Sequence, residues 1–259
     1  MAGFLLVFVY AWDYSQNGRD WDGLCQDGGV QSPIEINTFL TENITDQSDK
    51  YFFVEFKYKE TLIVNSNSSS LTGFNYSPKK NFHVFGDFGN ITINSKTYSS
   101  KYFKFHSPSE HTIDTNTYPL ELQIIHKDSN NTVVIVILYE YSGDHNEFLQ
   151  DVISAYYNLI GGKVNLQDSI GGWFAIKNFW YYEGSLSEPP CYEGAKYIVN
   201  DKPIPATLEQ ISFFRNILIG NNRELMPQNS RLVQHLNGLE DEEGLAQTLT
   251  NFLIIYLIL

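Results

Sequence analysis

The chain has 259 residues, of which 42% are hydrophobic and 15% aromatic, enough for one large packed domain or two small ones. Its formal net charge is -13, its pI is about 4.8 and its Lys and Arg residues are scattered, which argues against a nucleic-acid partner. The many Tyr and Phe residues, with numerous Asn, Ser and Thr residues, favour a β-rich protein with polar turns.

The amino end is a short apolar run, MAGFLLVFVYA, that closes on a small residue. It predicts a secretory signal over residues 1–11, although the usual basic residue before the run is missing. The alternatives are an N-terminal strand or a mis-assigned start codon. Five Asn-x-Ser/Thr triplets fit a glycosylated secreted protein. These sequons begin at Asn43, Asn67, Asn75, Asn90 and Asn130.

The segment 12–37 is rich in glycine and other turn-forming residues. We expect it to wrap over the surface, pinned by Trp12, Trp21 and Cys25. The chain has two cysteines, Cys25 and Cys191. An even count in a secreted protein predicts one disulfide, and the alternative is two free buried thiols.

Alternating and apolar runs bounded by turn residues predict short strands, and helical spacing predicts two helices. The expected strands are residues 51–58, 61–64, 82–85, 90–93, 102–106, 120–127, 132–139, 179–182 and 197–199. The expected helices are residues 146–160, which end at two glycines, and 207–218. Residues 65–70, NSNSSS, are expected to be a polar loop.

The stretch 102–126 is the centre of the pattern: YFKFH, then a loop, then LELQIIH. Strand alternation puts Lys104 and His106 on one face of the first strand and Glu121 and Gln123 on one face of the second. If the strands are neighbours, these four side chains converge. Four polar side chains on one face of the sheet indicate the floor of a pocket, because burying them without hydrogen-bond partners would cost free energy.

The carboxyl end, TNFLIIYLIL at residues 250–259, is too short to span a bilayer. It follows an acidic stretch at residues 240–243, an order that fits a glycolipid-anchor signal. A terminal strand or helix packed on the domain is the alternative. No linker or repeat divides the chain, so the predicted organisation is a signal at 1–11, one domain at 12–236 and a tail at 237–259.

Several of these motifs together resemble the secreted branch of the α-type carbonic anhydrases, over residues 12–233. They are QSPIEI, FKFHSPSEHTID with YPLELQIIH, WYYEGSLSEPPCYEGAKYIV, TLEQISFFR, NNREL and the placement of the two cysteines. The resemblance implies a mainly β (α+β) fold: a central twisted, mostly antiparallel sheet crossed by short helices, with a conical cleft.

In that family three histidines hold a zinc ion that lowers the pKa of a bound water to about 7. The matching positions here are Lys104, His106 and Gln123, so His106 is the sole remaining ligand position. An ammonium has no lone pair for zinc, and an amide oxygen is a weak ligand beside imidazole. We therefore expect no cofactor, or zinc if the site has a non-standard form.

The surrounding family positions are better kept. Glu121 matches a carboxylate that orients a ligand histidine, and Glu110 with Ser187 matches an acid–hydroxyl relay, vestigial here, while Glu188 replaces a residue that is usually Thr. The proton-shuttling position falls near residues 67–70, which contain no histidine. Other matches with mainly structural or supporting roles are His111, His126 and Tyr182. We expect His83, His145 and His235 to be ordinary surface or loop histidines.

Two hypotheses follow. The first is a catalytically inactive, carbonic-anhydrase-like ectodomain that binds protein partners through its surface and is secreted or at the cell surface, with a membrane tether through the tail. In it, the Lys104 ammonium fills part of the metal site and balances Glu121. The second is an active carbonate dehydratase with a non-standard metal site. Hydrolytic chemistry is set aside because no nucleophile has an obvious base. The oligomeric state is left open.

Overall fold

The computed structural model describes residues 12–45, 54–63, 73–77, 81–158, 161–170 and 178–237. The predicted signal, the 65–70 loop with Asn67, and the tail from residue 238 lie outside these residues. Within them are four α-helices, α1 (Leu24–Asp27), α2 (Glu147–Tyr157), α3 (Leu166–Ile170) and α4 (Leu208–Leu218), and one 3-10 helix, η1 (Thr38–Leu40). None of the described helices is long and apolar enough to cross a membrane.

Strands dominate the described residues. In chain order they are β1 (Glu35–Ile36), β2 (Glu42–Thr45), β3 (Val54–Tyr58), β4 (Glu60–Ile63), β5 (Gly73–Ser77), β6 (Asn81–Phe85), β7 (Gly89–Ile93), β8 (Lys96–His106), β9 (Thr112–Ile113), β10 (Asn116–Thr117), β11 (Leu120–Lys127), β12 (Thr132–Tyr141), β13 (Gly162–Asn165), β14 (Phe179–Ser185), β15 (Glu193–Asn200), β16 (Ile204–Ala206) and β17 (Gln234–Asn237).

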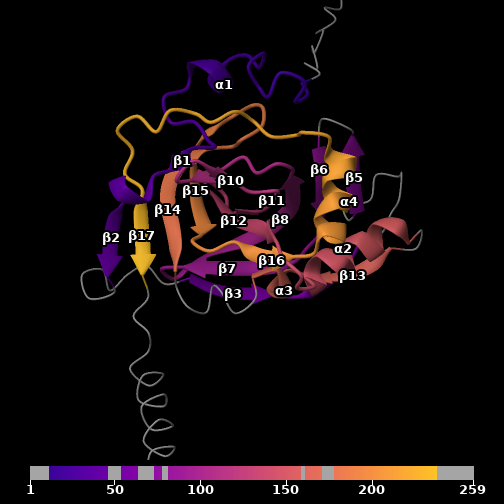
Figure 1. Cartoon of the computed structure of the whole chain (residues 1–259). Helices are drawn as coiled ribbons and strands as arrows, with labels where there is room; N and C mark the ends of the chain where they lie inside the picture. Colours follow the sequence, from indigo (N-terminus) through magenta and orange to yellow (C-terminus); the bar gives the residue numbers. More distant parts are fainter. Residues whose placement is uncertain are drawn as a thin grey trace, which may run out of the picture.

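The main sheet is twisted and runs β2-β17-β14-β15-β12-β11-β8-β6-β5, with β16 on β12 and β7 joining β3 to β8. Most pairs are antiparallel; β12 pairs in parallel with β15 and β16, and β17 with β2. In Figure 1, α2 and α4 lie at one flank of the sheet, and β2 and β17 form the opposite edge. The predicted mainly β fold with a mostly antiparallel twisted sheet is confirmed.

The central strand β11 is buried along almost its whole length, as its near-continuous apolar sequence requires. Alternation divides it between two cores. Leu122 and Ile124 pack into the larger cluster beneath α2 and α4, whereas Ile125 packs into a second cluster on the other face, with Tyr182 and Tyr197. Glu121 and Gln123 share the face of Ile125. The polar site therefore lies on the second face, at the end of the smaller core.

The predicted elements have the right type, and their bounds differ by a few residues. The first strand of the central stretch begins at Lys96 rather than Tyr102, and α2 ends at Tyr157. The Asn146 side chain accepts a hydrogen bond from Leu149 N, so Asn146 is the N-cap of α2. Short elements that lack a periodic signal were not predicted, such as α1, η1, β9, β10 and β16.

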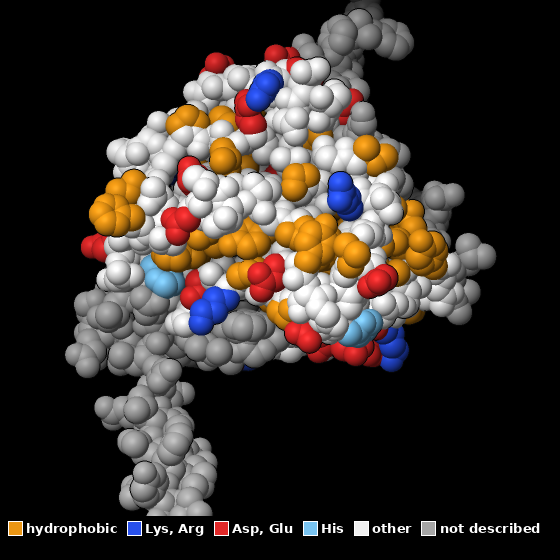
Figure 2. Space-filling view, viewed as in Figure 1, with side chains coloured by type: hydrophobic (Ala, Val, Ile, Leu, Met, Phe, Trp, Pro, Cys, Tyr) orange, Lys and Arg blue, Asp and Glu red, His pale blue; other side chains and the backbone are white. Residues whose placement is uncertain are grey.

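Figure 2 shows hydrophobic side chains in a band over the α4 and β16 side of the molecule.

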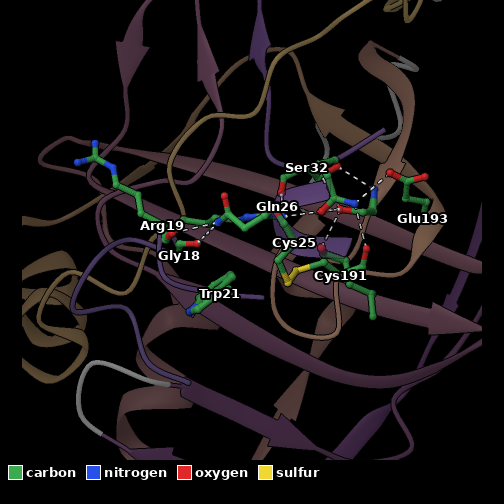
Figure 3. Close-up of a disulfide and its surroundings, with 12 residues drawn as sticks. Gly18, Arg19, Trp21, Cys25, Gln26, Ser32, Cys191 and Glu193 are labelled. Atoms are coloured by element: carbon green, nitrogen blue, oxygen red, sulfur yellow. Dashed lines mark hydrogen bonds between the residues drawn. A yellow bond between two sulfur atoms is a disulfide. The ribbon is translucent and has the colours of Figure 1, made fainter. Parts of the chain in front are cut away.

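The predicted disulfide joins Cys25 to Cys191, whose Cα atoms lie 5.1 Å apart. Both cysteines pack with Tyr14 and Trp21 in a third core cluster, against which Trp12 also packs, so the predicted pinning of the amino segment is confirmed. Figure 3 shows Cys25 and Cys191 bonded, and Glu193 beside them accepts hydrogen bonds from Val30 N and Gln31 Nε2. The bond ties the amino segment to the loop after β14.

Removal of this bond by the double substitution Cys25→Ser and Cys191→Ser should lower the free energy of unfolding by up to roughly 5 kcal/mol, because the bond closes a loop across 166 residues. Urea unfolding of the oxidised wild type and the double variant measures this difference. A reduced wild type should match the double variant. A loss below about 1 kcal/mol would mean that the closed loop does not constrain the unfolded chain.

Acid should destabilise the fold through His126, because burial lowers the pKa of His126 to about 3 from 6.5. His126 of the unfolded chain binds a proton below about pH 6.5, whereas His126 of the folded chain binds one only near pH 3. The free energy of unfolding is therefore unaffected by protonation of this residue above pH 6.5 and decreases as the pH falls between these two values. The slope is about 1.4 kcal/mol per pH unit. Between pH 6.5 and 5, the free energy of unfolding of His126→Gln should depend less steeply on pH than that of the wild type. The exposed control His145→Gln should show the same pH dependence as the wild type. Equal slopes in all three proteins would contradict this assignment.

Candidate functional site

Four segments bring the predicted site residues together. In the β8–β11 register His106 lies opposite Glu121, and Lys104 lies opposite Gln123. The predicted convergence of these four side chains is therefore confirmed. The third segment is β6, where His83 lies opposite Lys104. The fourth is the loop after β14, which carries Ser187 and Glu188 and closes on Cys191.

Lys104 is buried, with its ammonium between two groups of the loop after β14. Lys104 Nζ donates to Ser187 Oγ at 3.2 Å and lies 3.4 Å from Glu188 Oε2. The exposed fraction of the Lys104 side chain is 4%, and that of Glu188 is 9%. The expectation that Lys104 balances Glu121 is wrong. Glu188 is its partner, because the disulfide-bonded loop carries a carboxylate to the ammonium, and other donors already surround Glu121.

Glu188 has two further side-chain partners besides Lys104. His83 Nε2 lies 3.1 Å from Glu188 Oε2, and the Tyr102 hydroxyl donates to Glu188 Oε1 at 3.3 Å. Burial raises the pKa of Glu188, but attraction to His83 and then Lys104 outweighs burial, so the pKa lies well below the usual range. Glu188 is therefore a carboxylate at neutral pH.

His83 is not the surface or loop histidine that the sequence analysis expects. It lies in β6 and is 8% exposed. The predicted strand at residues 82–85 argued against a loop position, but alternation with Phe82 and Val84 gives only the face of His83 and not its burial. His235 also differs from expectation: it lies in β17 and stacks on Trp180, with ring centroids 3.7 Å apart. His145 is exposed, as expected.

Gln123 uses its whole amide group. Gln123 Nε2 donates to Glu110 Oε2 at 2.8 Å and to Glu121 Oε1 at 2.7 Å, and Gln123 Oε1 accepts from Ser187 Oγ at 3.4 Å. The two carboxylates fix which end of the amide carries the hydrogens. The Ser187 hydroxyl is thus directed to Gln123 rather than to Glu110.

Glu121 and Glu110 hold backbone N–H groups that would otherwise be unpaired in the interior. Glu121 Oε2 accepts from the backbone N–H groups of Glu110 and His111, and Glu110 Oε1 accepts from that of Arg223. Burial raises the pKa of Glu121, but interactions with His111 outweigh burial and lower it to about 2. His111 Nδ1 lies 2.9 Å from Glu121 Oε1, and His111 Nε2 lies 2.6 Å from the Tyr182 hydroxyl.

His106 donates from Nδ1 to the backbone oxygen of Asn221 at 2.6 Å, because a carbonyl can only accept. His106 Nε2 then faces Glu110 Oε2 at 3.4 Å and has no hydrogen-bond partner among the described residues. Burial lowers the pKa of His106, which favours the neutral ring. The neutral ring therefore carries its lone pair on Nε2, the nitrogen that faces Glu110.

The residues around His106 do not fit a zinc ion. Tetrahedral zinc sites take three or four His, Cys or carboxylate ligands, and no group of three or more His, Cys, Asp or Glu suited to a metal occurs in the described part of the chain. Lys104 brings a positive charge to one ligand position. Gln123 turns its amide hydrogens toward both carboxylates, so it presents donors there rather than lone pairs.

The other predicted residues are more dispersed. The His126 ring contacts the Tyr58 hydroxyl at 2.9 Å, away from the site in the larger core. Of the predicted sequons, Asn43 and Asn130 are exposed, Asn90 is half-buried in β7 and Asn75 lies in β5. The predicted shuttle region at residues 67–70 lies outside the described residues.

Comparison with known proteins places these features in a family. The model of the eukaryotic-type carbonic anhydrases matches residues 16–240. A carbonic anhydrase of Neisseria gonorrhoeae is 32% identical over 217 residues, covering 81% of this chain and 79% of that protein. The α-carbonic anhydrase structure of Photobacterium profundum has a TM-score of 0.68 at 22% identity, over 86% of this chain and 100% of that one. A structure described as dioscorin complexed with ascorbate has a TM-score of 0.66 at 25% identity, over 84% and 90% of the two chains.

A double-mutant cycle tests the pairing of Lys104. The substitution Glu188→Gln should lower the free energy of unfolding by about 3–5 kcal/mol, because it leaves the Lys104 ammonium buried without its counter-charge. Lys104→Met should offset part of that loss, giving a coupling energy of about 1–3 kcal/mol for the pair. The matched cycle of Lys104→Met with Glu121→Gln should give a coupling near zero. A larger coupling to Glu121 than to Glu188 would reverse the assignment.

Proposed function

This chain belongs to the eukaryotic-type carbonic anhydrase family, and we propose that it is a catalytically inactive member that acts as a binding or structural component. The observation that carries the proposal is the identity of the groups at the ligand positions. A buried ammonium at Lys104 and a fully hydrogen-bonded amide at Gln123 stand where two zinc-binding imidazoles are expected. One histidine alone gives far too little affinity to retain zinc.

The retained acids do not by themselves argue for catalysis. Glu110 and Glu121 together accept hydrogen bonds from three backbone N–H groups, those of Glu110, His111 and Arg223. Loss of either carboxylate would leave buried donors unpaired, at a cost of about 1–3 kcal/mol each. These hydrogen bonds to the backbone are a sufficient structural reason for the presence of Glu110 and Glu121. The hydroxyl of Ser187 is likewise engaged, since it bridges Lys104 and Gln123.

A binding role suits the scaffold, because the sheet and its two cores are complete without any metal chemistry. The fold also serves a protein described with a different small molecule, dioscorin with ascorbate. We propose that the partners of this chain are proteins that contact its surface, and that it works outside the cell. The disulfide and the exposed sequon residues Asn43 and Asn130 support an extracellular glycoprotein. A membrane tether through the tail is part of the same proposal.

The competing function is reversible hydration of carbon dioxide with a non-standard metal site. It is favoured by the names of the relatives, which include carbonic anhydrases of several bacteria. It requires Lys104 to leave its place beside Glu188, and Gln123 to give up its hydrogen bonds to two carboxylates. Each step leaves a buried charge or a buried hydrogen-bond acceptor without its partner, which costs free energy.

Elemental analysis of the purified chain after dialysis against zinc should find far less than one zinc per chain. The double variant Lys104→His and Gln123→His restores three imidazoles beside His106 and should bind close to one zinc, with a higher melting temperature in the presence of the metal. The same double variant with His106→Ala should lose the metal again. Near-stoichiometric zinc in the wild type, together with carbon dioxide hydration above the buffer rate, would refute the proposed inactivity.

A further inference from the structure

A row of polar side chains crosses four adjacent strands at the β3 side of the sheet. The register aligns Lys57 of β3 with Asn90 of β7, Asn90 with Ser99 of β8, and Ser99 with Lys127 of β11. Aligned residues of neighbouring strands project from the same face of a sheet. The two lysines at the ends of the row are three strand spacings apart, which is roughly 14 Å.

The row points away from the larger core. The adjacent residues Phe56, Ile91 and Tyr98 belong to that core or pack against it. The side chains of the row therefore project from the opposite face of the sheet. Lys57 is exposed and Lys127 is half-buried. After the irregularity in β8 beyond Ser100, the same face continues to Lys104 and Gln123. The row therefore extends outward along the sheet face that carries the buried site.

A notch opens beside the row where β8 changes its neighbour. Through Ser99 it pairs with β7, and from Tyr102 it pairs with β6, so Ser100 and Lys101 lie at the break. A cavity of about 670 Å³ occupies the break, and its charged lining residues are Lys57, Lys59, Lys101 and Asp87. A Cβ atom on Gly89 would lie 2.3 Å from the Lys57 backbone oxygen, so the backbone itself forms part of the wall. The row and this notch together are called the lysine notch.

The charge balance of the lysine notch favours an anion. Lys57 pairs with Glu55 at 3.0 Å and Lys59 with Asp87 at 2.5 Å, both exposed and therefore weak pairs. Lys101 has no ion pair with another described residue. The three lysines of the described lining face two carboxylates, Asp87 in the lining and Glu55 beside Lys57, so one positive charge is in excess in a chain whose net charge is -13. On the face in Figure 2, by contrast, Lys and Arg side chains are few and isolated from one another.

We propose that the lysine notch binds the sulfate groups of an anionic polysaccharide. Ammonium groups spread over roughly 14 Å, from the exposed Lys57 to the half-buried Lys127, suit an extended chain with repeated charges. The Asn90 amide and the Ser99 hydroxyl, both in the cavity lining, supply hydrogen bonds for sugar hydroxyls. The described lining residues include no aromatic ring on which a nucleic-acid base could stack, which disfavours a single-stranded nucleic acid. The inference does not depend on whether the metal site is active.

The test uses the full chain without glycans, because Asn90 begins a sequon inside the lysine notch. Calorimetric titration with a sulfated oligosaccharide derived from heparin, at low and at physiological salt, should show binding that weakens with salt. The triple variant Lys57→Ala, Lys101→Ala and Lys127→Ala should weaken binding at least about tenfold, since each exposed charge contributes a small share. The control variant Lys163→Ala and Lys202→Ala, at exposed lysines outside the lysine notch, should bind like the wild type.

Four results would overturn the proposal. They are no binding by the wild type, an equal loss in the control variant, equal binding of the unsulfated oligosaccharide, or an affinity for inorganic sulfate that matches that of the oligosaccharide. A tighter, lysine-dependent binding of single-stranded RNA would assign the surface to a nucleic acid instead. Among the described residues, no hydrogen bond or ion pair joins Lys57, Lys101 or Lys127 to the Lys104 network, so folded variants should keep the melting temperature of the wild type.

Discussion

The structure of the site depends on one constraint, the cost of a buried ammonium. Lys104 lies in the centre of the sheet, where an unpaired charge would cost several kcal/mol. Glu188 supplies the counter-charge from the loop after β14, which the disulfide at Cys191 ties to the amino segment. Gln123 then completes the arrangement between the acids and the hydroxyl of Ser187. The residue types at Lys104, Gln123 and Glu188 therefore depend on one another.

The sheet and one wall of the site could be predicted from the sequence, for a physical reason. The side chains of a strand alternate with a period of two, so a correct strand assignment also assigns the faces. Residues 102–106 and 120–127 alternate clearly, and Lys104, His106, Glu121 and Gln123 do converge. The order of the strands was not predicted, since alternation alone does not specify which strands are neighbours, and the family resemblance implied only a twisted, mostly antiparallel sheet.

The partners of the charged groups could not be predicted in the same way. Alternation says which face a side chain occupies, but not which loop reaches it from a distant part of the chain. Glu121 is close to Lys104 in the predicted sheet, yet two backbone N–H groups and two side chains already surround it. Glu188 arrives from a loop with no periodic pattern. Short elements such as β9 and β16 were missed for the same reason, because tertiary contacts rather than local sequence define them.

Under the proposed function, the hydrogen bonds of the site take the place of the contacts that a metal would make. A ligand imidazole would offer one N–H group to the carboxylates, whereas the amide of Gln123 offers two and joins Glu110 to Glu121. Replacing Gln123 alone by histidine would leave one buried carboxylate short of a donor, and replacing Lys104 alone would leave Glu188 without its ammonium. Each single reversion is therefore unfavourable, although both together rebuild the three-histidine set. Under the proposed function, two simultaneous substitutions separate the present hydrogen-bond network from a three-histidine site.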